Sequence, residues 1–346
     1  MFCDNKDNNN QLSCDKKLFS EIISLISLCF SLFVIYISVK KVKMNITNVL
    51  ILQIIMSEVL DGFNIILAII FDTFKTYTFE NYPERMGICI SQIYIGVFSC
   101  LWNLFSSLFI SLRIYDTMEN KNRIFKNKFM YEYTTTLSYG IPCIIAYIFW
   151  TVQIMDQTSI LRNKTYNDFY PEKHGIKSNF FRYMYCWVSG WKNYTLFMLC
   201  SVLIGANFYF SIYKSVSFIK RVSNEIEENE DSGRKSIQNK MKKINQMMWS
   251  LILYPVVSGI IWFIYYIFQI LAGKANDYNS DHALSKFMKN GLGSWFLIIL
   301  ISCRQFIFTF LFFWTQGSLK NYAYNFITCQ NSKKNANIDK LKKLNE

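Results

Sequence analysis

The feature that most constrains the fold is a stretch of 23 residues without a charge, which lies between Cys89 and Arg113. An α-helix rises by about 1.5 Å per residue, so this stretch is long enough to cross a hydrocarbon core about 30 Å thick. Other apolar blocks of similar length alternate with charged, Asn-rich segments. We therefore predict an all-α membrane protein, built as a seven-transmembrane helix bundle. The predicted spans are residues 18–39, 46–71, 89–112, 132–155, 192–213, 248–271 and 293–314.

The distribution of basic residues predicts the orientation of the bundle. With the N-terminus outside, 22 of the 37 Lys and Arg residues fall on the cytoplasmic side and 14 on the outer side, while Arg304 lies inside a span. This bias follows the positive-inside rule. It also explains the net charge of +13 without a nucleic-acid partner. We expect a multi-pass protein of the plasma membrane, with residues 1–17 as an extracellular tail and residues 330–346 as a cytoplasmic tail.

Cysteines and glycosylation signals agree with this orientation. Five of the 10 cysteines lie within predicted spans, where cysteine most often serves as a small apolar packing residue. Sequons at Asn163 and Asn193 fall outside, so we predict glycosylation at both. Four cysteines also fall on the outer side, where an oxidising environment permits disulfides. These four are Cys3, Cys14, Cys89 and Cys186.

Charged residues inside the predicted spans form a small group. Glu58 and Asp61 are three residues apart in the second span and so share a face of the helix, and Arg304 lies at a similar depth in the seventh. A charge at the bilayer centre costs at least about 2.5–3.5 kcal/mol, so it normally faces the bundle interior and finds a partner. We predict an intramembrane network of these three residues. Three roles remain open for it: a buried ion pair that fixes helix packing, a state switch or ion site, and direct ligand contact.

Two features of the inner half concern movement and anchoring. Pro255 in the sixth span removes a backbone donor and predicts a hinge. After the seventh span, apolar residues at helical spacing predict a short interfacial helix over residues 315–329 on the inner leaflet. Cys329 at the end of that helix is a palmitoylation candidate.

Motifs for enzymatic chemistry are missing from the sequence. It contains no phosphate loop, zinc-ligand spacing or nucleophile elbow, and its two histidines, His174 and His282, lie in predicted outer loops. The seventh span has no lysine that could hold retinal. We therefore expect no enzyme activity, no cofactor and no metal.

A few short motifs carry a resemblance to a known family. Cys89 opens the third span, Cys186-Trp187 stands in the second outer loop, and Gln316-Gly317 ends the seventh span. Over residues 18–329 the chain resembles a G-protein-coupled receptor. The motifs are similar to those of the secretin/adhesion class and of the cyclic-AMP-receptor-like group of slime moulds and other protists. The third span ends Leu112-Arg113-Ile114, so the Asp-Arg-Tyr order of the rhodopsin class is absent.

The resemblance implies a mechanism and two partners. It implies a disulfide between Cys89 and Cys186 and an extracellular ligand, of unknown identity, that binds among the outer halves of the spans. It also implies that the sixth span pivots at Pro255 to admit a heterotrimeric G protein. The residues that would face this G protein are Arg113, Lys240, Lys242 and Lys243.

A second function class stays open. A seven-span transporter or ion channel could use Glu58, Asp61 and Arg304 as its permeation or coupling centre, because charged residues inside a membrane also mark ion pathways.

Overall fold

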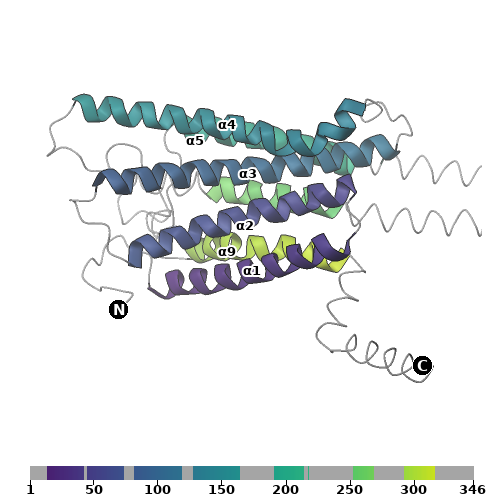
Figure 1. Ribbon diagram of the computed structural model, residues 1–346, viewed down its shortest axis with the longest axis horizontal. Coiled ribbons are helices and arrows are strands. Elements are labelled where there is room, and N and C mark those ends of the chain that lie inside the picture. The colour runs from purple at the N-terminus through teal and green to yellow at the C-terminus, as the bar shows by residue number, and fades with distance from the viewer. Residues whose placement is uncertain are drawn as a thin grey trace, which may run out of the picture.

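The computed structural model describes the helical parts of the chain, which are residues 14–42, 45–73, 82–118, 128–163, 191–213, 217, 252–268 and 292–315. Figure 1 shows the helices running roughly side by side along the long axis of the molecule. No β-strand occurs within these described ranges. The elements are α1 (Cys14–Lys41), α2 (Ile46–Thr73), α3 (Tyr82–Met118), α4 (Lys128–Asn163), α5 (Trp191–Phe208), the π-helical turn η3 (Tyr209–Tyr213), a helix over Ile252–Phe268, named helix 252–268 below, and α9 (Leu292–Thr315).

Five of the helices are long and apolar enough to cross a membrane. Their apolar windows are Ile22–Lys40, Ile46–Leu67, Ser91–Asp116, Tyr133–Met155 and Tyr194–Tyr213. Helix 252–268 is apolar but shorter, and α9 is a 24-residue helix with Arg304 as its one charged residue. The predicted helical membrane architecture is therefore confirmed.

The helices extend further than the predicted spans. The first begins at Cys14 rather than at residue 18, and α4 continues from residue 155 to Asn163. A helix can continue past the hydrocarbon boundary because its backbone hydrogen bonds form equally well among polar side chains. The four last residues of the predicted tail over 1–17 are thus helical. The predicted interfacial helix over 315–329 and the tail after it lie outside the described residues, apart from Thr315.

The distribution of polar and apolar side chains is that of a protein surrounded by lipid. Large apolar side chains such as Ile144 on α4 and Val202 on α5 are exposed, at 64% and 68% of their surface. Meanwhile the charged side chains of Glu58 and Arg304 are each only 2% exposed. A soluble protein rarely leaves so many large apolar side chains in water while it buries charges, whereas a bilayer favours this arrangement. The chain is a membrane-embedded helical protein.

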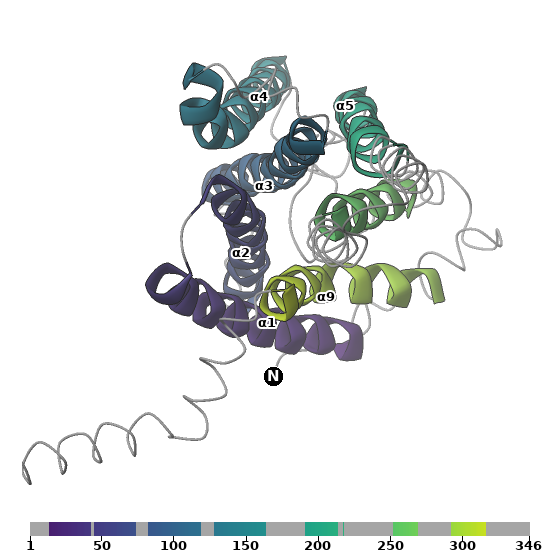
Figure 2. The same ribbon diagram turned by 90° about the vertical axis from the view of Figure 1, so that its right-hand side faces the viewer.

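Helix α3 occupies the centre of the arrangement. It contacts α2, α4, α5 and η3, while α1 packs against both α2 and α9. Figure 2 shows this arrangement along the bundle, with α1 and α9 adjacent although they lie at opposite ends of the chain. The face of α3 that carries Ser99, Asn103 and Ser111 is fully or almost fully buried. These small polar side chains therefore meet neighbouring helices rather than lipid.

Small hydroxyl side chains line the contact between α1 and α9. Ser24, Ser27, Ser31 and Ser38 recur at helical spacing and are buried. The Ser31 hydroxyl lies 2.6 Å from the hydroxyl of Thr309, and it also donates to the Ser27 carbonyl at 2.8 Å. Small side chains let two membrane helices approach closely, and their hydroxyls add hydrogen bonds across the contact.

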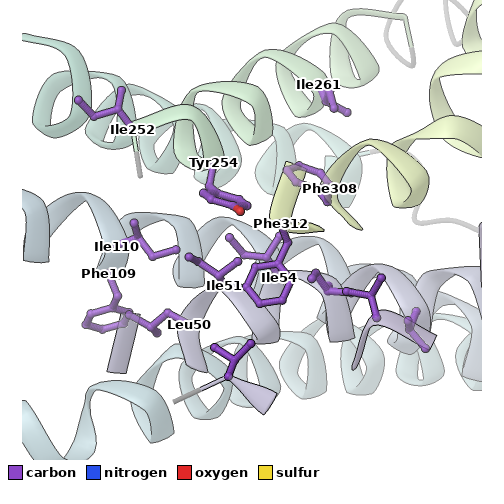
Figure 3. Packing of buried hydrophobic residues seen from close by; sticks show 14 of the residues in the cluster. Leu50, Ile51, Ile54, Phe109, Ile110, Ile252, Tyr254, Ile261, Phe308 and Phe312 are labelled. Carbon is purple, nitrogen blue, oxygen red and sulfur yellow. The ribbon is translucent and has the colours of Figure 1, made fainter. Parts of the chain in front are cut away.

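Buried apolar residues of α1, α2, α3, helix 252–268 and α9 form a cluster that includes Leu50 of α2. Figure 3 shows the ring of Tyr254, from helix 252–268, lying near Phe312 of α9 and Ile51 of α2. All three residues are at most 1% exposed. The Tyr254 hydroxyl forms a hydrogen bond with the Thr315 hydroxyl, 2.6 Å away. This bond joins helix 252–268 to the end of α9.

A glycine in helix 252–268 provides a test of this packing. A Cβ atom at Gly259 would lie 2.9 Å from Cζ of Phe208, whereas a Cβ at Gly205 would meet nothing within 4 Å. We expect Gly259→Val to lower the free energy of unfolding by about 1–3 kcal/mol, because it overpacks the contact with α5. Gly205→Ala is the matched control and is expected to be neutral or slightly stabilising. Thermal unfolding of the purified protein in lipid nanodiscs measures both, and equal effects would contradict this packing.

Candidate functional site

The candidate site is the group of charged side chains inside the bundle. Glu58 and Asp61 lie on the buried face of α2, between apolar residues that pack against α3 and α9. Arg304 stands in the middle of α9, which contacts α2 directly. The exposed fractions of the three residues are only 2% to 3%. The structure thus brings together the three residues that the sequence singled out.

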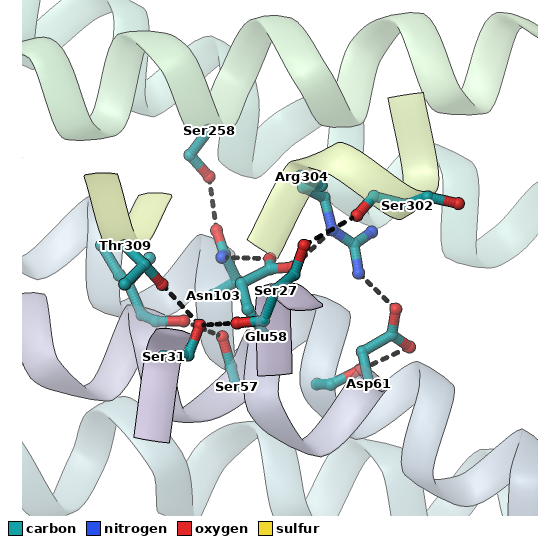
Figure 4. Close-up of polar contacts among 12 residues, drawn as sticks. Ser27, Ser31, Ser57, Glu58, Asp61, Asn103, Ser258, Ser302, Arg304 and Thr309 are labelled. Atoms are coloured by element: carbon teal, nitrogen blue, oxygen red, sulfur yellow. Dashed lines mark hydrogen bonds and ion pairs between the residues drawn. The ribbon is translucent and has the colours of Figure 1, made fainter. Parts of the chain in front are cut away.

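Arg304 bridges the two carboxylates. Its Nε donates to Oε2 of Glu58 at 2.5 Å, and its Nη2 donates to Oδ2 of Asp61. Figure 4 shows the guanidinium between the two acidic side chains. A guanidinium is a planar fork of five donors, so two of its nitrogens can each donate to a different carboxylate in a fixed geometry.

The hydrogen bonds extend to two further helices. Nδ2 of Asn103 on α3 donates to Oε1 of Glu58 at 2.8 Å, and the Ser258 hydroxyl donates to Oδ1 of Asn103 at 2.5 Å (Figure 4). Ser258 belongs to helix 252–268, so a continuous chain of hydrogen bonds joins α9, α2, α3 and that helix. We call Glu58, Asp61, Asn103, Ser258 and Arg304 the Arg304 network.

Trp262 completes the surroundings of the arginine. The guanidinium carbon of Arg304 lies 4.2 Å from the centre of the Trp262 ring. A cation over an aromatic face is stabilised by roughly 2 kcal/mol or more when it is shielded from water. Trp262 lies four residues after Ser258 and therefore on the same face of helix 252–268. This helix thus contacts the network at two successive turns.

The chemical groups of the Arg304 network are two carboxylates, one guanidinium, an amide and a hydroxyl. No group of three or more His, Cys, Asp or Glu that could hold a metal exists in the part of the chain that the structure describes. Burying these charges is costly unless all of them keep their partners, so the arrangement strongly favours one relative position of the four helices.

Neighbouring amide contacts hold other helices together. Nε2 of Gln53 on α2 donates to the Thr135 carbonyl of α4 at 2.9 Å, and its Oε1 accepts from Ser106 of α3 at 3.3 Å. On α5, Oδ1 of Asn207 accepts from the Ser111 hydroxyl of α3 at 3.1 Å. These contacts join α2 to both α4 and α3, and α5 to α3, without involving the charged residues.

Sequence reasoning missed part of the site. The predicted network did not include Asn103, Ser258 or Trp262, and the bond from Asn103 to Glu58 was not predicted. The signal that could have found them is the spacing of Pro255, Ser258 and Trp262, which puts a hydroxyl and an aromatic ring on one face of the sixth predicted span.

Other predicted site residues stand apart from this network. Arg113 is half-buried near the end of α3, and Pro255 is buried in helix 252–268, one turn from Ser258. Asn163 is the last residue of α4 and Asn193 the third of α5, so both sequons meet helix ends rather than the middle of a loop. Cys89 lies within α3. The remaining predicted positions, Cys186, Lys240, Lys242, Lys243 and Cys329, lie outside the described residues.

Five described cysteines carry free thiols, and no disulfide occurs among the residues that the structure describes. They are Cys29, Cys100, Cys143, Cys200 and Cys303, all within helices. The Cys89–Cys186 disulfide therefore stays a prediction, because Cys186 is not described.

Comparison with known proteins adds no family. No protein-family model matches the chain, and no curated protein shows significant similarity to it. The receptor resemblance thus rests on the sequence motifs quoted above.

Proposed function

We propose that the chain is a seven-span receptor of the plasma membrane that transmits an extracellular signal to a heterotrimeric G protein and has no enzyme activity of its own. In this proposal the N-terminus lies outside, and helix 252–268 and α9 belong to the sixth and seventh spans. A disulfide between Cys89 and Cys186 would hold the second outer loop over the ligand. Glycosylation at Asn163 and Asn193 and palmitoylation at Cys329 remain predictions.

The observation that supports a switching protein most directly is the Arg304 network. Its central ion pairs are buried, and they join helices from both ends of the chain. Interactions of this kind favour discrete helix arrangements over continuous deformation, because a small displacement leaves a buried charge without its partner. A ligand that binds one arrangement better than another then shifts the population between them.

Helix 252–268 is the element that we assign to this movement. It contacts the network through the Ser258 hydroxyl and the Trp262 ring, while the ion pairs themselves connect α2 and α9. It can therefore move relative to α3 without breaking an ion pair. Pro255 lies on the same helix, one turn before Ser258, and would supply the pivot. Its movement would open the inner side, where Arg113, Lys240, Lys242 and Lys243 would meet the G protein.

A transporter or ion channel is the second candidate, because the network contains two carboxylates for a single guanidinium. Excess acidic groups inside a membrane are typical of proton and cation pathways. Against this, all the network residues are almost fully buried, and hydrogen bonds from Asn103 and Arg304 engage both oxygens of Glu58.

The deciding experiment is nucleotide exchange on co-expressed G-protein α subunits. We expect the wild-type receptor to accelerate basal exchange and a Lys240/Lys242/Lys243 triple alanine variant, present at the same surface level, to lose most of that acceleration. The reason is that basic side chains on an inner loop attract acidic surfaces and set association rates. Proton or cation flux into proteoliposomes that Glu58→Gln abolishes, together with no exchange on any α subunit tried, would support transport instead.

A further inference from the structure

A second polar cluster lies inside the bundle and takes no part in the Arg304 network. The sulfur of Cys100 on α3 lies 3.9 Å from the sulfur of Cys200 on α5. The hydroxyl of Tyr266 on helix 252–268 contacts both sulfurs, at 3.4 Å from Cys100 and 3.3 Å from Cys200. Two thiols and one phenol from three different helices thus form a closed triangle.

This triangle differs from ordinary cysteine packing. A packing role needs only apolar volume, which any small apolar residue could fill. Here both thiols are 0% exposed and face each other across a helix contact, with Tyr266 at 1% exposure between them. Both cysteines carry free thiols in this structure.

We propose that Cys100 and Cys200 form an oxidation site, at which a hydroperoxide converts the two thiols into a disulfide that links α3 to α5. A disulfide has an S–S distance of about 2.05 Å, so the two sulfurs have to approach by roughly 1.9 Å from their separation of 3.9 Å. Rotation about the Cα–Cβ bonds moves each sulfur by amounts of this size. The two helices are already in contact.

The chemistry balances with one hydroperoxide. The sulfur of one cysteine attacks the outer oxygen of the hydroperoxide, the O–O bond breaks, and a sulfenic acid and an alcohol result. The sulfur of the other cysteine then attacks the sulfenic sulfur, an S–S bond forms, and the S–O bond breaks with loss of water. Two thiols and one hydroperoxide give one disulfide, one alcohol and one water. The sulfurs lose two electrons and the peroxide gains them.

The Tyr266 hydroxyl supplies a proton acceptor and donor, which an apolar site otherwise lacks. Buried thiols in apolar surroundings react slowly, because the thiolate is the nucleophile and charge separation is unfavourable there. The Tyr266 hydroxyl contacts both sulfurs, so it can accept the proton of the attacking thiol while its own proton goes to the departing oxygen. A neutral hydroperoxide dissolves in the bilayer and has to enter between α3 and α5 to react, because both thiols are 0% exposed. Tyr266 is therefore a positioning and proton-transfer group for this oxidation.

The test uses the wild-type protein in lipid nanodiscs and tert-butyl hydroperoxide as the probe. After oxidation the protein is denatured, its remaining thiols are alkylated, and its peptides are identified by mass spectrometry. We expect a peptide pair linked through Cys100 and Cys200, at least tenfold more abundant than any linked pair that involves one of the other three free thiols, Cys29, Cys143 and Cys303. Dithiothreitol should restore both thiols, and the oxidised protein should unfold at a higher temperature than the reduced protein.

The chain provides a matched internal control. Cys143 lies 3.3 Å from the Tyr94 hydroxyl but has no thiol partner among the described residues, so it should not enter a disulfide. Tyr266→Phe is expected to slow the Cys100–Cys200 link at least fivefold while the oxidation rate of lipid-facing Cys29 stays unchanged. Recovery of Cys100 and Cys200 as free thiols under conditions that oxidise Cys29 would overturn the proposal. So would a link whose rate does not depend on the Tyr266 hydroxyl.

Discussion

Replacing Arg304 with methionine is expected to lower the free energy of unfolding by about 3–5 kcal/mol, because it leaves two buried carboxylates without their common partner. Glu58 and Asp61 are at most 3% exposed, so water cannot replace the lost guanidinium without opening the bundle. The methionine side chain is of similar length and fills most of the space. The loss is therefore electrostatic rather than a cavity effect. Thermal unfolding in nanodiscs and the amount of protein at the cell surface measure it.

The matched control removes all three charges at once. A triple variant with Glu58→Leu, Asp61→Leu and Arg304→Met leaves no unpaired charge, and buried ion pairs exchanged as a set for apolar side chains are often neutral or stabilising. We expect this variant to recover most of the stability that the single variant loses. A triple variant as unstable as Arg304→Met would show that shape, and not charge pairing, decides the packing at this position.

Replacing Asn103 with leucine is expected to raise ligand-independent nucleotide exchange about tenfold. Asn103 is the link through which helix 252–268 is bonded to Glu58, because it accepts from Ser258 and donates to the carboxylate. Removing a buried hydrogen-bond partner costs about 1–3 kcal/mol, and a tenfold change corresponds to about 1.4 kcal/mol. If that energy is drawn from the resting arrangement, the active arrangement becomes correspondingly more populated.

Gln53→Leu is the control for Asn103→Leu. Gln53 also joins α2 to α3, by a half-buried amide, but it connects them to α4 rather than to helix 252–268. It should reduce stability without raising basal exchange. Equal basal exchange in the two variants would mean that the bond between Ser258 and Asn103 does not bias the receptor. A normal thermal transition with unchanged exchange in Asn103→Leu would lead to the same conclusion.

The sequence predicted the parts of this fold that depend on local composition. An apolar run of about 20 residues has few alternatives to a membrane helix, so each predicted span coincides with a helix wherever the structure describes it. The contact between Arg304 and the two acidic residues could also be anticipated, because Arg304 is the one basic residue in the interior of a predicted span, whereas Lys192 is the first residue of its span. Basic residues are so rare in the spans that this ion pair could be predicted from the sequence.

The other contacts between helices depend on how each helix is rotated about its own axis. Serines are frequent in the spans. The spacing of Ser258 and Trp262 puts both on one face of the sixth predicted span, but it does not indicate that this face meets Asn103. The contact between Cys100 and Cys200 likewise requires that two particular faces of α3 and α5 meet. Such rotations are set by the summed packing of long surfaces, which periodicity alone does not fix. The helix ends could not be predicted from the apolar runs either, because α3 and α4 continue through polar residues.

The order of synthesis gives the Arg304 contacts a consequence for biogenesis. Arg304 follows Glu58 by 246 residues and Asp61 by 243, so both acids enter the membrane well before their partner exists. At about 5–20 residues per second, the ribosome needs roughly ten to fifty seconds to reach Arg304. During that interval the second span carries unpaired carboxylates that a membrane quality-control system can detect. A chain that stops short of α9 keeps these carboxylates unpaired with a guanidinium, whereas a chain that reaches Arg304 can pair them.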